Sequence, residues 1–146
     1  MEVDAATGNV EIQKYVAVDD CGNIINPLVV EGQLHGGIAQ GIAQALYEEV
    51  AYDPDTGQLL TGTLLDYLVP TANEIPTPIL DRTITPSPTN ELGVKGIGEA
   101  GTIAASAAVM NAIIDALRPL GITHVDMPAS PDRLWQMIEQ AKGARA

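Results

Sequence analysis

A single glutamate lies within a glycine-rich stretch that could hold its carboxylate open to a ligand. The stretch is LGVKGIGEAG, residues 92–101, and the glutamate is Glu99. Glycine is favoured where the backbone needs a positive φ or where another group approaches closely. A general base must be ionised when it acts, as a carboxylate is in neutral water. Two interpretations of Glu99 follow: a general base facing a bound substrate, or an ordinary acidic residue near a helix start, where backbone dipoles favour negative charge.

The same stretch contains a literal match to a dinucleotide-binding pattern. GIGEAG, residues 96–101, has the form G-x-G-x-x-G, it precedes a predicted helix, and Asp126 follows later in the chain. The residues before it, TPSPTNELGVK, are not the buried apolar strand that this pattern requires. A glutamate in the turn would also bring a negative charge close to a pyrophosphate. The sequence therefore favours a different role for these glycines.

Glutamines and glycines recur along a helix that we predict over residues 27–49. Asn26 and Pro27 form a typical helix start, with a capping residue before a proline at the first helical position. Each glycine inside a helix costs about 0.5–1 kcal/mol relative to alanine, so the glycines need a reason. They fit close packing against a neighbouring helix, or contact with a bulky group to which a glutamine hydrogen-bonds. The apolar face is predicted to be Ile38, Ile42 and Leu46, and the second stripe Gln33, Gly37, Gln40 and Gln44.

Alternating apolar residues predict several short strands. TGN is typical of a hairpin turn between residues 2–4 and a strand at 10–18. A second hairpin turn is predicted at 52–58. The segments ILDRTIT (79–85) and ITHVDM (122–127) have the composition of strands.

Two more amphipathic helices are predicted after an irregular loop at 86–101. The first ends at Pro119 and Gly121, and the second begins at Ser130 and Pro131. Hairpins and about three helices, without regular strand–helix alternation, predict an α+β fold within one domain, residues 1–146. The inward residues are predicted to be Ile103, Ala107, Met110, Ile114 and Leu117 in the first helix and Leu134, Ile138 and Ala141 in the second.

The composition excludes some classes of partner. The chain has 146 residues, a formal net charge of −12 and seven Lys and Arg residues, so a basic face for nucleic acid or for an anionic membrane is not expected. The longest uncharged stretches, 32–47 and 100–114, are shorter than the roughly 20 residues that span a bilayer. The N-terminus lacks the basic and apolar regions of a secretory signal. We therefore expect a cytoplasmic setting.

The cysteine and histidine content argues against a protein-ligated metal. Cys21 is the single cysteine, which excludes an internal disulfide and a cysteine zinc or iron–sulfur site in this chain. His35 and His124 are far apart in sequence and lack matching carboxylate spacing. We expect no metal-ligating residue and no histidine-based catalytic triad.

Two long segments together resemble a known family. DDCGNIINPLVVEGQLHGGIAQGIAQALYEE and, later, TPSPTNELGVKGIGEAGTIAASAAVMNAI are similar to the C-terminal part of the molybdopterin-binding large subunit of the xanthine dehydrogenase, aldehyde oxidase and carbon monoxide dehydrogenase family. The resemblance runs from about residue 3 to residue 138. It implies that the chain is part of a larger molybdenum-cofactor-binding domain.

The resemblance assigns roles to residues of both segments. Glu99 matches the family's catalytic base, which takes a proton from a molybdenum-bound hydroxyl or water while water supplies the oxygen of the product. Gln33 matches a glutamine beside the molybdenum cofactor. Gly36 and Gln40 are candidates for the same contact, although simple helix packing explains them equally well. The loop against the pterin is matched by Lys95, Gly96, Ile97 and Gly98.

The resemblance also implies cofactors and partners. These are a molybdenum–molybdopterin cofactor, in a cytosine dinucleotide form, with FAD and iron–sulfur (2Fe-2S) clusters on partner subunits. The rest of the molybdenum subunit would carry the other half of the cofactor site and the pocket for a small-molecule substrate, which is an aldehyde, a purine, an N-heterocycle or carbon monoxide. We expect the isolated chain to be inactive. The alternative is a non-catalytic binding or assembly module, or a relic, that keeps the fold but only docks to a partner.

Overall fold

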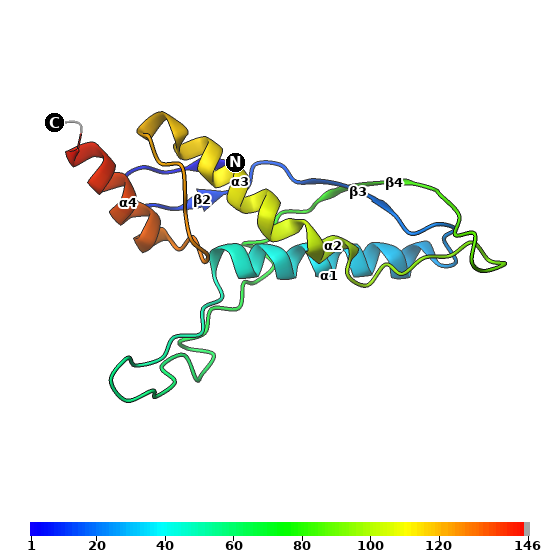
Figure 1. Cartoon of the computed structure of the whole chain (residues 1–146), viewed down its shortest axis with the longest axis horizontal. Coiled ribbons are helices and arrows are strands. Elements are labelled where there is room, and N and C mark those ends of the chain that lie inside the picture. The colour runs from blue at the N-terminus through cyan, green and yellow to red at the C-terminus, as the bar shows by residue number, and fades with distance from the viewer. Residues whose placement is uncertain (145–146) are drawn as a thin grey trace.

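The long helix α1 (Pro27–Leu46) lies lengthwise in one part of an elongated molecule, and the C-terminal helix lies beyond its end (Figure 1). The computed structural model describes residues 1–144. The arrangement of short strands and helices confirms the predicted α+β class. The other elements are β1 (Glu2–Val3), β2 (Val10–Glu11), β3 (Val16–Asp20), β4 (Ile79–Thr83), α2 (Ala100–Ile103), α3 (Ala105–Leu117), the 3-10 helix η1 (Arg118–Leu120) and α4 (Pro131–Gly143).

Helix α1 begins where the sequence predicts. The side chain of Asn26 accepts hydrogen bonds from the backbone N–H groups of Leu28 and Val29, at 3.1 and 3.3 Å. These bonds satisfy two of the donors that a helix start leaves free. The helix ends at Leu46, three residues before the predicted end, because the N–H of Glu48 turns back to the carbonyl of Ala43. The predicted apolar face is buried in the core.

Helices α1 and α2 are in backbone contact where glycines face each other. A Cβ atom built on Gly101 would lie 2.6 Å from the carbonyl oxygen of Leu34, and one built on Gly37 would lie 2.9 Å from the amide nitrogen of Thr102. The Thr102 hydroxyl donates to the carbonyl of Gly37 at 2.9 Å. Close helix packing therefore explains Gly37. It does not explain Gly36, because no atom lies within 4 Å of a Cβ placed there.

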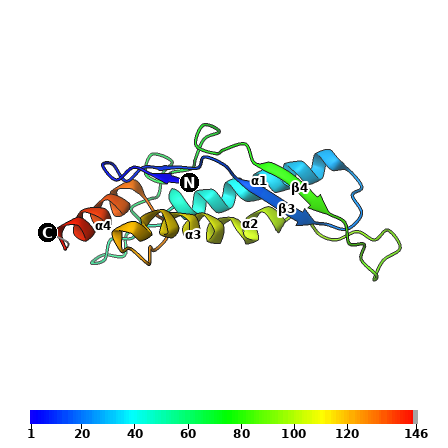
Figure 2. The ribbon, with the colours of Figure 1, turned by 90° about the horizontal axis from the view of Figure 1, so that it is seen from above.

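The strands form two separate pairs. The N-terminal hairpin is confirmed, with β1 and β2 antiparallel. The strand predicted at 10–18 is wrong in extent, because β2 pairs with β1 whereas β3 pairs in parallel with β4, side by side along α1 (Figure 2). Within β3 the valines face outward: Val16 and Val18 are 54% and 58% exposed, while Ala17 packs against the core.

The predicted helix after the loop is broken in two. Ala104, with φ −101° and ψ −11°, ends α2 and precedes α3, so the buried face changes at this point. Ile103 is 72% exposed, contrary to prediction, whereas Met110 and Leu117 are buried as predicted. The segment Ala100–Leu120 is long and apolar enough to span a bilayer by composition, but its buried side chains belong to the core. The buried residues of α3 are Ala105, Val109, Met110, Ile113 and Leu117.

The C-terminal part completes the core. Residues 122–127 are not a strand, because no neighbouring strand pairs with them in the described part, although Ile122 and Val125 are buried. Helix α4 begins after Ser130 as predicted, and Leu134 and Ile138 are fully buried. The turn predicted at 52–58 is present, but its flanks form one isolated bridge rather than strands.

We predict that Gly101→Ala destabilises the fold by about 1–3 kcal/mol, because the added methyl group meets a backbone carbonyl that cannot move aside. Gly32→Ala is the matched control, since a Cβ there meets nothing within 4 Å, and we expect it to stabilise α1 by about 0.5–1 kcal/mol. Urea denaturation of both variants measures the difference. Equal midpoints would show that α1 and α2 are not in backbone contact.

Candidate functional site

The glycine-rich loop is bound to the carboxyl end of β3. The backbone N–H of Lys95 donates to the carbonyl of Cys21 at 2.8 Å, and the N–H of Asn23 donates to the carbonyl of Gly93 at 3.0 Å. The Asn23 side chain also donates to the carbonyl of Leu92 at 2.7 Å. The loop thus runs beside the connection between β3 and α1 and enters α2 from a fixed position.

Asp20 contacts the chain at the start of this loop and in its middle. Its Oδ1 accepts from the backbone N–H of Gly22 at 2.8 Å and from that of Thr85 at 3.2 Å, and the Lys95 ammonium lies 3.3 Å away. The Thr85 hydroxyl, the Gly22 N–H and Lys95 hold the pKa of Asp20 well below its ordinary value, because each favours the ionised carboxylate. Gly22 takes the positive φ, +66°, that this turn requires.

Glu99 is the residue immediately before α2, and it is exposed. Its carbonyl accepts from the N–H groups of Thr102 and Ile103, at 3.0 and 3.1 Å. Its carboxylate makes no capping hydrogen bond to the helix. The backbone of Glu99 is therefore held by hydrogen bonds to α2, while its carboxylate is free to meet a ligand.

Gln33 contacts the loop at Gly98, the residue before Glu99. A Cβ atom built on Gly98 would lie 3.7 Å from Oε1 of Gln33, so α1 and the loop are in contact at this point. No atom lies within 4 Å of a Cβ built on Gly96. Within residues 1–144, the backbone N–H groups of 96–99 donate no hydrogen bond. Four consecutive backbone donors beside a glutamine amide are therefore available to a polar ligand.

Gly36 and Gln40 lie one and two turns further along α1. Both line a groove of about 570 Å³ between α1 and the irregular segment that contains Val69 and Ile75. Oε1 of Gln40 lies 3.4 Å from the Thr102 hydroxyl, which ties this glutamine to α2. The structure thus places Gln33 near the loop and Gly36 and Gln40 on a neighbouring groove of the same helix.

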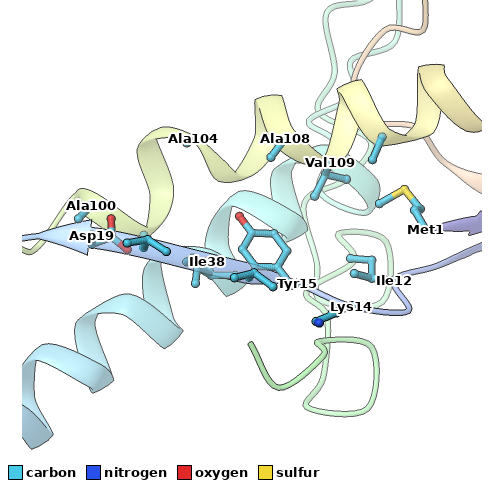
Figure 3. A pocket seen from close by; sticks show the side chains of 15 residues that line it. Met1, Ile12, Lys14, Tyr15, Asp19, Ile38, Ala100, Ala104, Ala108 and Val109 are labelled. Carbon is cyan, nitrogen blue, oxygen red and sulfur yellow. The ribbon is translucent and has the colours of Figure 1, made fainter. Parts of the chain in front are cut away.

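Residues on either side of Glu99 line two further cavities. Ile97 lines one of about 160 Å³, together with Leu34 and Cys21. Ala100 lines another of about 370 Å³ between β3 and the α2–α3 segment, where the Tyr15 ring faces Ala104 and Ala108 (Figure 3). The loop is therefore bordered by open space as the glycine content predicts, although Gly101 serves helix packing instead.

Sequence reasoning missed Asp20, Asn23 and Thr102 as residues that position the loop. The signal for Asp20 was available, since an aspartate two residues before a glycine is typical of a side-chain-to-backbone turn. Its bond to Thr85 joins residues 65 positions apart, which no local pattern indicates. Among the described residues, no group of three or more His, Cys, Asp and Glu side chains is placed to hold a metal ion.

The chain is similar to several known proteins. The family described as "Molybdopterin cofactor-binding domain" matches residues 1–76. The carbon monoxide dehydrogenase large chain of Hydrogenophaga pseudoflava is 39% identical over 96% of this chain and 17% of its own length. The nicotine 6-hydroxylase large subunit of Paenarthrobacter nicotinovorans is 46% identical over 92% of this chain and 16% of its own length.

The fold agrees with a solved structure as well. Quinoline 2-oxidoreductase from Pseudomonas putida 86 superposes with a TM-score of 0.90 and 46% identity, over 94% of this chain and 17% of that one. The chain therefore spans about a sixth of the length of the proteins it matches. Because these matches cover nearly all of the chain, they include both α1 and the loop that carries Glu99.

We predict that Asp20 makes stability depend on pH in the acid range. A lowered pKa means that its bonds contribute fully above the ordinary value of 3.8 and are lost as the pH falls below it. Between about pH 5 and about pH 3, the urea midpoint should fall less for Asp20→Asn than for the unaltered chain. Asp19→Asn, the neighbouring carboxylate on the other face of β3, is the control and should titrate like the unaltered chain. An identical pH slope for the unaltered chain and Asp20→Asn would contradict this role.

Proposed function

The chain belongs to the molybdopterin cofactor-binding domain family, which confirms the resemblance of its two motifs, and on that premise we propose that it is part of a molybdenum-dependent oxidoreductase that hydroxylates a small molecule with water as the oxygen source. The observation that carries the proposal is the contact between α1 and the glycine-rich loop. It brings Gln33 beside Gly98, with the free carboxylate of Glu99 one residue further on.

The residues present fit a molybdopterin cofactor. The free N–H groups of 96–99 and the amide of Gln33 are donors for the polar edge of a pterin, and Gly96 leaves space that any other side chain would fill. We assign Lys95 and Ile97 to the same loop contact, and Gly36 and Gln40 to a second contact in the neighbouring groove of α1.

The roles of the residues follow from their chemistry. When bound, the cofactor supplies the oxidation of the substrate. Gln33 orients the cofactor through amide hydrogen bonds, and the loop backbone holds the cofactor in position. Glu99 accepts the proton that must leave the attacking water, because its carboxylate is exposed and makes no capping hydrogen bond to α2.

The chain supplies one part of this site, and the rest of a molybdenum subunit supplies the remainder. The parallel pair β3–β4 supports this proposal, because parallel sheets are ordinarily covered on both faces while Val16, Val18 and Ile79 are more than half exposed. In the proposed complex, partner subunits carry FAD and 2Fe-2S clusters, and the pterin carries a cytosine dinucleotide. The proposed location of the complex is the cytoplasm. Residues 1–146 then form the C-terminal segment of the cofactor-binding domain.

The substrate is a small molecule whose identity depends on residues outside this chain. The names of the relatives refer to carbon monoxide, nicotine and quinoline, at comparable levels of identity. The parts that they share with this chain therefore serve the chemistry common to them. A panel containing an aldehyde, a purine, an N-heterocycle and carbon monoxide, offered to the assembled enzyme, identifies which class is oxidised.

We predict that Glu99→Gln keeps the fold and the bound cofactor but lowers turnover by roughly 10²–10⁴-fold, because the amide cannot accept the proton. The measurement is turnover per bound molybdenum in the assembled enzyme. Glu91→Gln, which alters another exposed glutamate of the same loop, is the control and should retain full turnover. Wild-type turnover in Glu99→Gln would show that Glu99 is not the base and would favour the non-catalytic module.

We predict that Gln33→Ala weakens retention of the cofactor, because it removes the amide that faces the loop at Gly98. Molybdenum content per chain after extended dialysis measures this loss. Gln44→Ala is the matched control, because Gln44 is exposed on the same stripe of α1 but more than two turns away. Equal molybdenum content in the two variants would assign Gln33 to packing.

A further inference from the structure

Glu99 lies between two anchors that belong to different parts of the fold. On one side Lys95 is bound to the end of β3 through its backbone N–H and its ammonium. On the other side Gly101 packs against the backbone of α1 at Leu34. The residues between these anchors make few contacts of their own, so the position of the Glu99 carboxylate depends on both anchors.

One carboxylate oxygen, Oδ1 of Asp20, binds the side chain of the first anchor, Lys95. Oδ1 of Asp20 contacts Thr85, where the chain leaves β4, and Lys95, where the chain approaches Glu99. The same oxygen accepts the N–H of Gly22, which starts the turn from β3 towards α1. The residue before the loop, Thr85, the residue in its middle, Lys95, and the turn towards the helix that carries Gln33 are therefore all joined to one group.

The charge of Asp20 matters for this arrangement. A carboxylate oxygen accepts several hydrogen bonds at once and attracts the Lys95 ammonium, whereas an amide of the same shape accepts fewer and has no charge. The other acid groups on the paired strands are Asp19 on β3 and Asp81 on β4, and the cations of this region are Lys95 and Arg82. Lys95 is the cation that contacts Asp20.

We propose that Asp20 is a positioning residue for the reaction: by holding Thr85, at the start of the loop, and Lys95, in its middle, to the end of β3, it places the carboxylate of Glu99 relative to Gln33. This inference rests on the proposed function, because it assigns Asp20 a task only where Glu99 is the base. A displacement of about 1 Å of a catalytic group can lower a rate by roughly a hundredfold, so a small loosening of the loop is sufficient to be measured.

The test compares Asp20→Asn with the control Asp19→Asn in the assembled holoenzyme. Hydrogen–deuterium exchange of peptides that cover residues 86–99 should be faster in Asp20→Asn and unchanged in Asp19→Asn. Turnover per bound molybdenum should fall by about 10–100-fold in Asp20→Asn, with little change in KM, because the base is displaced while binding of the substrate is retained. Molybdenum content should stay at the level of the unaltered enzyme.

A double variant separates positioning from a general loss of structure. If Asp20 acts through Glu99, then Asp20→Asn should cause no further loss of turnover in the Glu99→Gln background. An equal loss in both backgrounds, unchanged exchange of residues 86–99, or full turnover despite faster exchange would each overturn the inference. If Asp20→Asn does not assemble, Thr85→Val is the second variant, because it removes only a hydroxyl donor. It should produce the same changes in smaller degree. Normal exchange and turnover in Thr85→Val would overturn the inference.

The two proposals fail in different ways. Wild-type turnover in Glu99→Gln removes the proposed function, whatever Asp20→Asn does to the loop. Loss of turnover in Glu99→Gln, together with normal turnover in Asp20→Asn, leaves the proposed function in place and removes the role of Asp20.

Discussion

The backbones of α1 and α2 touch at Gly37 and Gly101, and the geometry of the proposed site depends on this contact. A side chain at either glycine would collide with backbone atoms of the other helix. Because the contact is so close, Gln33, one turn earlier on α1, comes within reach of Gly98, just before α2. Larger residues would separate the helices and move the glutamine away from the loop. Helix packing and the proposed site therefore both require glycine at Gly37 and Gly101.

The second constraint lies at the carboxyl end of the β3–β4 pair. Parallel strands end at the same edge, so the chain leaving β3 towards α1 and the chain leaving β4 into the loop begin side by side. The carboxylate of Asp20 joins them, and Asn23 continues the contact along the loop. The loop lacks regular structure, but bonds to a strand end and to a helix limit its freedom. A carboxylate can thus be exposed and still occupy a defined place.

The surface of the chain differs from that of an independent domain. Val16, Val18 and Ile79 on the strands, and Leu28 at the start of α1, are exposed apolar side chains. A segment rich in exposed leucines extends away from the core beyond the end of α1 (Figure 1). The chain spans about a sixth of the length of the proteins that it matches. The core itself is continuous, because buried residues of α1, α3 and α4 form one cluster.

Local sequence determined the elements whose stability comes from neighbouring residues: the capped start of α1, the N-terminal hairpin and the start of α4. It could not determine that β3 and β4 pair in parallel, that the helix after the loop breaks at Ala104, or that 122–127 lacks a strand partner. It also could not separate Gly37, which packs, from Gly36, which faces open space. These outcomes depend on contacts between distant residues, such as Asp20 with Thr85 or Gly37 with Thr102, each 65 positions apart. Only the folded chain brings such groups together, and so only the tertiary structure decided how the glutamate, the glutamine and their supporting residues are arranged.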